Sequence, residues 1–297
     1  MTKAKTLITV ASWEDRFHLG IRKIVNDCSL SRVVMFYYKE FEERTANSRN
    51  EVETLFREKG VGYSAVPIAF GDAPGTWQSI YESIGSIVSS NAPVLMDLST
   101  MPRETLWAAL CQLERYRTPT SYIYHSPADY ADWLSRDPGR PRLVYKLSGI
   151  ATIGRQTCLV ITTGYDPERT RQLMWYYEPR RILLGFQDGR QFQNDVKNVQ
   201  RHRDSLKEEY REFEVEEFEL DAYADDHGES VISKQIEKWQ NSHNIVMTSL
   251  GPKLGAIALF RVHSQHPETS LAYAPSNEFN PDYSTGISQS HFGEIQW

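Results

Sequence analysis

The stretches Val94-Leu95-Met96 and Ile245-Val246-Met247 decide the fold, because the same pattern follows each of them. Pro102-Arg103 comes after the first stretch and Pro252-Lys253 after the second, and an apolar helix-like run follows in both places. A short apolar run bounded by turn residues is typical of a buried strand. The chain is therefore expected to contain the same strand, loop and helix twice.

The repeat continues outward from these stretches. Residues 120–124 (TSYIY) match residues 269–273 (TSLAY), and residues 33–37 (VVMFY) match residues 182–186 (ILLGF). Strands alternate with helices in each half, which indicates a mainly parallel sheet with helices on both faces. The sequence predicts an α/β fold of two tandem Rossmann-like units related by internal duplication.

We expect the first unit to span residues 1–134 and the second residues 155–297, the second ending in an irregular tail. Between them, residues 135–154 contain two prolines and the cations Arg136, Arg140, Arg142 and Lys146. Charged segments with prolines are typical of extended, solvated linkers. Residues 135–154 are therefore predicted to be a basic connector.

Composition limits the class of protein. The chain has 297 residues, 40% of them hydrophobic and 24% charged, which is typical of a globular protein. A net charge of -6 argues against strong non-specific binding of nucleic acid. No apolar run reaches the roughly 20 residues that span a bilayer, and the start does not resemble a signal peptide. We predict a cytoplasmic protein that does not associate with membranes.

The cysteines and histidines indicate no metal site. Cys28, Cys111 and Cys158 are odd in number and far apart, so neither a disulfide framework nor a zinc ribbon is expected. Among the histidines, His263 and His266 are the one close pair, and two histidines alone make a poor zinc site. These two are predicted to be solvated or to cap a helix.

The loops after the first and fourth strands of each half carry the candidate site. In an open parallel sheet ligands bind at these loops, because the next helix begins there with N–H groups that point at the ligand. Small hydroxyl residues, a proline and then a cation suit an anion, since the hydroxyls and amides donate and the cation adds charge. The predicted ligand-binding residues are Ser12, Arg16, Ser99, Thr100, Arg103, Thr163, Gly164, Ser249, Gly251 and Lys253.

Other uses of these loops stay open. Ser99 or Thr100 is also suited to capping the helix that Pro102 starts. Aromatic side chains fall at the predicted strand ends, where they suit either base stacking or completion of the core. They are Trp13, Tyr37, Tyr38, Tyr130 and Tyr165.

A strand ending in Asp97, a loop rich in Ser and Thr, a basic residue and an apolar helix resemble the CRISPR-associated Rossmann-fold (CARF) sensor domains. Residues 97–103 and 248–253 carry the resemblance, together with the order of elements in each half. In that family two such domains face each other and bind a cyclic oligonucleotide, and this chain would supply both. The first loop lacks the glycines of the family pattern, and the second has Gly251 but no leading aspartate.

We therefore predict a sensor that binds a nucleotide or other phosphorylated ligand at a cleft between the units, with a possible protein partner in a prokaryotic antiviral defence complex. One alternative is a hydrolase of nucleotides or nucleic acid, of the ring nuclease or glycosidase type, with Glu14, Asp97 or Asp166 as acid or base. Another is a non-catalytic structural subunit of such a complex. The chain has no P-loop, G-x-G-x-x-G, H-E-x-x-H or G-x-S-x-G motif, so no cofactor or catalytic residue is assigned.

Overall fold

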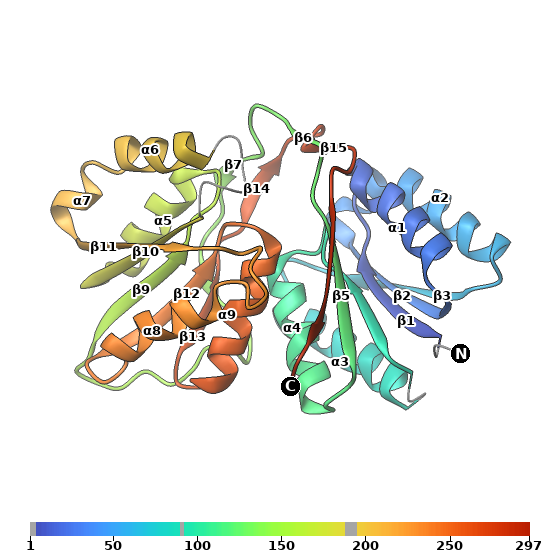
Figure 1. The fold of residues 1–297 in the computed structure, drawn as a ribbon, viewed down its shortest axis with the longest axis horizontal. Coiled ribbons are helices and arrows are strands. Elements are labelled where there is room, and N and C mark those ends of the chain that lie inside the picture. Colours follow the sequence, from blue (N-terminus) through green and yellow to red (C-terminus); the bar gives the residue numbers. More distant parts are fainter. Residues whose placement is uncertain (1–3, 90–91, 188–194) are drawn as a thin grey trace. The chain divides into compact units, whose positions relative to one another are not determined.

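A computed structural model describes residues 4–89, 92–187 and 195–297. The chain divides into two compact units, each of which is described by itself. Unit 1 comprises Met1–Leu134 together with Phe279–Trp297, and unit 2 comprises Ser135–Glu278. Each unit is an α/β structure around a six-stranded, mainly parallel sheet, as the sequence predicts (Figure 1).

The sheet of unit 1 has the strand order β16-β5-β4-β1-β2-β3. Strands β1 to β5 run parallel, and β16 runs antiparallel to β5. The strands are β1 (Lys5–Val10), β2 (Leu30–Tyr38), β3 (Gly62–Ile68), β4 (Val94–Asp97), β5 (Thr120–His125) and β16 (Ser290–Ile295).

Helices α1 and α2 pack together on one face of this sheet, and α3 and α4 pack together on the other (Figure 1). The helices are α1 (Asp15–Asp27), α2 (Glu42–Glu58), α3 (Ala73–Val88) and α4 (Arg103–Arg115), with a 3-10 turn η1 (Lys39–Phe41) before α2. Helix α1 buries Phe17, Ile21 and Ile24, whose spacing places them on one side of a helix. They pack on Leu7 and Val33 of the sheet.

The sheet of unit 2 has the equivalent order β11-β10-β9-β12-β13-β8. Its strands are β9 (Gln156–Thr162), β10 (Arg181–Gln187), β11 (Glu214–Leu220), β12 (His243–Ser249), β13 (Ser270–Tyr273) and β8 (Arg142–Leu143). Its helices are α5 (Pro167–Tyr177), α6 (Asp195–Ser205), α7 (Glu209–Glu212), α8 (Glu229–Trp239) and α9 (Lys253–Gln265). Strand β8 is antiparallel to β13, as β16 is to β5.

Strand register confirms the repeat residue by residue. Ile8 lies opposite Met96 in unit 1, and Val160 lies opposite Met247 in unit 2. One strand further out, Met96 lies opposite Tyr122 and Met247 lies opposite Leu271. The motif methionines therefore occupy the same place in both sheets. By this register, Thr248 stands in unit 2 where Asp97 stands in unit 1.

The end of the chain differs from the prediction of an irregular tail on the second unit. Phe279–Trp297 belongs to unit 1, where β16 forms the edge of the sheet. On the way, β14 (Ser276–Phe279) pairs with β7 (Ser135–Pro138), and β15 (Ser284–Thr285) pairs with β6 (Asp129–Tyr130). The sequence of β16, SHFGEI, shows neither an apolar run nor a regular alternation, so its pairing depends on β5.

The segment 135–154 also differs from the predicted solvated linker, because it belongs to unit 2. It contributes β8 to the sheet, and its side chains Val144 and Leu147 are only 1% and 4% exposed. Arg142 lies over the ring of Tyr273. These few apolar residues, which lie among prolines and cations, attach the segment to unit 2.

Two smaller features complete the description. His263, predicted to be solvated or to cap a helix, is buried, with Nδ1 3.3 Å from the hydroxyl of Thr269. Within the described ranges, no helix has the length and apolar character needed to cross a membrane.

Candidate functional site

The candidate loops lie where the strand order of each sheet reverses. Strand β1 has β2 on one side and β4 on the other, and β9 likewise lies between β10 and β12. Loops that leave two such adjacent strands diverge to opposite faces, and this divergence makes the usual binding position of an open α/β sheet. In both units the predicted residues lie on these loops, at the end of the strand before them or in the first turn of the helix after them.

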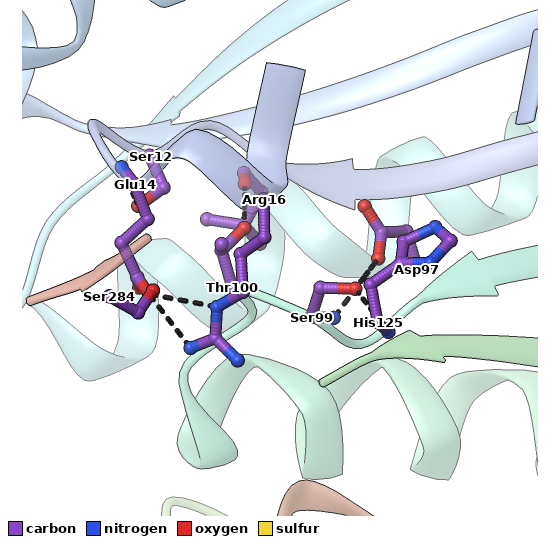
Figure 2. A network of polar contacts seen from close by, with 9 residues as sticks. Ser12, Glu14, Arg16, Asp97, Ser99, Thr100, His125 and Ser284 are labelled. Atoms are coloured by element: carbon purple, nitrogen blue, oxygen red, sulfur yellow. Dashed lines mark hydrogen bonds and ion pairs between the residues drawn. The ribbon is translucent and has the colours of Figure 1, made fainter. Parts of the chain in front are cut away.

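In unit 1 the loop after β4 is organised around the carboxylate of Asp97 (Figure 2). This carboxylate accepts hydrogen bonds from the hydroxyl of Thr9 (3.1 Å), from the backbone N–H of Ser99 (3.0 Å) and from the Ser99 hydroxyl (2.6 Å). The Ser99 oxygen in turn accepts from the backbone N–H of His125 (2.9 Å). All four residues are fully buried, so Asp97 and Ser99 hold three strands together.

The loop after β1 carries a buried ion pair. Arg16, 3% exposed, lies 2.8 Å from the carboxylate of Glu14, which also accepts a hydrogen bond from the hydroxyl of Ser284 (2.5 Å; Figure 2). The Ser12 hydroxyl accepts from the backbone N–H of Glu14 (3.2 Å). Burial is the largest single influence and lowers the Arg16 pKa, but the Glu14 carboxylate, together with Tyr130, Tyr124 and Tyr283, raises it above its ordinary value. The charge of Arg16 is therefore compensated within unit 1.

Thr100 ties the two loops of unit 1 to each other. Its hydroxyl donates to the backbone carbonyl of Val10 at 2.9 Å. Pro102 occupies the N-cap position of α4, and its side chain makes no capping hydrogen bond. The alternative that Ser99 or Thr100 caps α4 is therefore wrong, and both hydroxyls instead stabilise the loop.

In unit 2 the corresponding loops pack backbone against backbone. The N–H of Leu250 donates to the carbonyl of Thr162 (2.8 Å), and the Thr163 hydroxyl donates to the carbonyl of Gly185 (2.9 Å). A Cβ on Gly164 would overlap the carbonyl of Leu250, and one on Gly251 would lie 2.7 Å from the carbonyl of Thr163. Both glycines are therefore needed for the approach of one loop to the other.

Arg103 and Lys253 hold equivalent positions in the two units. Each is the first residue of its helix, α4 or α9, and each follows a proline at the N-cap. Both are half-buried, whereas Ser249, at the end of β12, is 2% exposed. The structure thus gathers the predicted residues of each unit at the carboxyl ends of the two central strands of its sheet. That the two sets share one ligand stays a prediction.

The three acids proposed for a hydrolase all have structural partners. Asp97 and Glu14 accept the hydrogen bonds described above. Asp166 caps α5 by accepting from the backbone N–H of Glu168 at 2.9 Å. No group of three metal-ligating side chains occurs within residues 4–89, 92–187 and 195–297.

His125, which the sequence analysis did not single out, is another buried titratable group here. Its Nδ1 is 2.8 Å from the hydroxyl of Ser290 on β16. Burial lowers the pKa of His125, with Asp97 opposing and Lys23 among the cations reinforcing the effect. The sequence offered a signal for His125, because it directly follows an apolar strand run. It offered none for Ser284 and Ser290, which are far in sequence from Glu14 and His125.

The aromatic side chains at the strand ends of unit 1 pack on one another. Trp13 lies 5.1 Å from Phe41 and 6.0 Å from Phe279 between ring centroids, and the guanidinium of Arg44 lies 3.6 Å from the Trp13 ring centre. Further pairs are Tyr38 on Phe70, Tyr37 with Arg49, Tyr130 with Tyr283 and, in unit 2, Tyr165 with Arg201. These contacts favour a packing role over base stacking.

The fold and the site together define a tandem Rossmann-like protein. Each unit has a candidate anion-binding site at the carboxyl ends of its central strands. No known protein-family profile matches the chain, and no curated protein matches it in sequence. Its structure is similar to that of a type III CRISPR defence DNA nuclease activated by cyclic oligoadenylate, with a TM-score of 0.58 and 9% sequence identity. The similarity covers 87% of this chain and 64% of the nuclease chain. It confirms the predicted resemblance at the level of the fold.

A shorter match is to Can2 from Sulfobacillus thermosulfidooxidans in complex with cyclic tetra-adenylate. It has 11% identity and a TM-score of 0.32, and covers 41% of this chain and 32% of that one.

Proposed function

We propose that this chain is a sensor that binds a nucleotide-type, phosphate-bearing ligand in a prokaryotic antiviral defence system. The observation that carries the proposal is the start of α4 and α9, where Arg103 and Lys253 each follow an N-cap proline. A cation in the first turn is unfavourable beside the positive end of the helix dipole. An anion at the same place reverses this, because it interacts with both the cation and the helix amides.

A comparison of the two loops supports the same role for the cation in both units. The loops are held together by different means, side chains around Asp97 in unit 1 and glycine backbone in unit 2. Proline and a cation nevertheless end both of them.

The ligand class follows from the resemblance. The nuclease of similar fold is described as activated by cyclic oligoadenylate. A cyclic oligonucleotide is therefore the first ligand to test, and a protein partner that carries the output is part of the same proposal.

The test measures binding by calorimetry and thermal shift with cyclic oligoadenylates, linear oligoadenylates and AMP. Arg103→Glu and Lys253→Glu are each expected to weaken binding at least about tenfold, the loss of a charge-assisted hydrogen bond. Arg57→Glu is the matched control, because Arg57 is an exposed cation (64%) on α2. Chromatography of each ligand after incubation reports turnover.

Absence of binding by any of these nucleotides would contradict the proposal. Equal weakening by Arg57→Glu would indicate a general charge effect rather than a site. Turnover of a nucleotide by the wild-type chain, but not by the variants, would favour the hydrolase alternative.

A further inference from the structure

The last strand of each sheet comes from the opposite half of the sequence. Strand β5 of unit 1 is followed by a segment that leads to β8, and β8 pairs with β13 of unit 2. Strand β13 is followed by a segment that leads to β16, and β16 pairs with β5 of unit 1. Each repeat therefore supplies the edge strand of the other repeat's sheet.

The exchange is reciprocal at the level of single residues. Tyr124, next to the last residue of β5, lies opposite His291, while Tyr273 ends β13 and lies opposite Arg142. Just beyond, the N–H of Ser288 donates to the carbonyl of Ser126 (2.9 Å), and in unit 2 the N–H of Gly139 donates to the carbonyl of Pro275 (3.0 Å). The spacing from tyrosine to partner is the same in both repeats, so the two exchanged segments are equivalent.

In unit 1 the returning segment is fixed along its whole length. At its start, Phe279 packs on Trp13 and Phe41. Along its path Ser284 donates to Glu14, and at its end the Trp297 indole N–H donates to the carbonyl of Thr118 (2.6 Å).

Gly293 shows how close β16 lies to β5. A Cβ at this position would overlap the ring of Tyr122. The strand also covers backbone groups of β5 that would otherwise form an open sheet edge.

In unit 2 the connecting segment is fixed just as closely. The N–H of Val144 donates to the carbonyl of Leu271, and the N–H of Leu271 donates to the carbonyl of Leu147, both at 2.8 Å. Val144 and Leu147 are buried. Gly149 has φ +57, and a Cβ there would overlap the carbonyl oxygens of Glu268 and Thr269.

We infer that the chain is a covalently fused, strand-exchanged pair. Its two halves, residues 1–153 and 154–297, are expected to stay bound to each other after the peptide connection between them is cut. Exchange of identical elements is a known route to dimers, and here both partners lie in one chain. The turn after β8 is the place where the chain can be cut, because Ile150 and Ile153 are 79% and 101% exposed. The occupant of each sheet edge is then the strand of the opposite half.

The first experiment inserts a site-specific protease sequence between Ile153 and Gly154 of the full chain. After complete cleavage, the two fragments are expected to elute together at the size of the intact protein in native buffer. They are expected to separate in denaturant and to reassociate on its removal. Fragments that separate in native buffer would overturn the inference.

The second experiment shows that exchanged strands hold the fragments. In the uncut chain, Gly293→Val is expected to speed hydrogen exchange of β5 about tenfold or more while leaving β13 protected. Gly149→Val is the matched variant and is expected to do the reverse. Gly293→Ala and Gly149→Ala serve if either valine variant fails to fold. Opening of β13 by a Gly293 variant, or of β5 by a Gly149 variant, would overturn the inference.

Discussion

The loop after the fourth strand is built by side chains in unit 1 and by backbone in unit 2. In unit 1 the buried carboxylate of Asp97 binds Thr9 and Ser99. In unit 2 Thr248 takes that place, and Gly164 and Gly251 let the loops touch directly. The comparison teaches that the same loop position can be held either by a buried polar network or by close approach of one backbone to another.

The largest expected effect is the removal of the unit 1 network. Asp97→Ala should lower the free energy of unfolding by about 3 to 4 kcal/mol, because three buried donors lose their acceptor. Asp97→Asn is the conservative control and should recover part of the loss, since its amide keeps one acceptor oxygen. Urea unfolding measures both. A loss below about 1 kcal/mol for Asp97→Ala would show that the network is not what holds this loop.

The corresponding change in unit 2 acts on backbone packing. Gly164→Val should cost about 2 to 3 kcal/mol, because its side chain pushes the Leu250 loop away. Ser12→Ala, at the equivalent position in unit 1, should cost only about 1 kcal/mol for one lost hydrogen bond. Hydrogen exchange locates each effect. Equal costs at the two positions would contradict the distinction between the loops.

The next effect in size is a dependence of stability on pH through His125 in unit 1. The pKa of His125 is lowered from 6.5 by burial, so the unfolded chain binds a proton more readily than the folded one. The stability this contributes is present above about pH 6.5 and is lost as the pH falls, by at most about 1.4 kcal/mol per pH unit for one proton.

His125→Asn should therefore flatten the dependence of the unfolding free energy on pH between 7 and 5. Burial also lowers the pKa values of His227, His243 and His263 in unit 2 and of His291 in unit 1, so a slope remains. An unchanged slope in the variant would contradict a contribution from His125. The groups around His125 to control for are Asp97, Lys23, Arg16 and His291.

The smallest effect is expected at Thr248. Its hydroxyl and that of Thr162 are buried and find no hydrogen-bond partner in the described part of the chain. Thr248→Val should leave stability unchanged or raise it by up to about 1 kcal/mol, because a buried unsatisfied group is removed. Thermal unfolding measures this. A clear loss of stability would mean that the hydroxyl is used in the folded protein.

Several parts of this protein were predictable because their signal is local. The runs around Met96 and Met247 are continuous and apolar, as strands covered on both faces require, and the register places both methionines as the repeat predicts. The loop positions of Arg103 and Lys253 follow from the strands before them and the helices after them. The pattern did not say whether Ser99 and Thr100 face a ligand or the fold, because that depends on Asp97 and Val10 nearby.

By itself, then, the sequence determined the α/β class, the duplication and the loops that carry the cations, since apolar period and turn residues act over short stretches of chain. Tertiary structure alone decided that β16 completes unit 1, that β8 completes unit 2 and that Ser284 reaches Glu14. An edge strand gains its stability from the backbone groups of the strand it meets rather than from its own side chains. The partner of an edge strand therefore cannot be predicted from the residues of that strand alone.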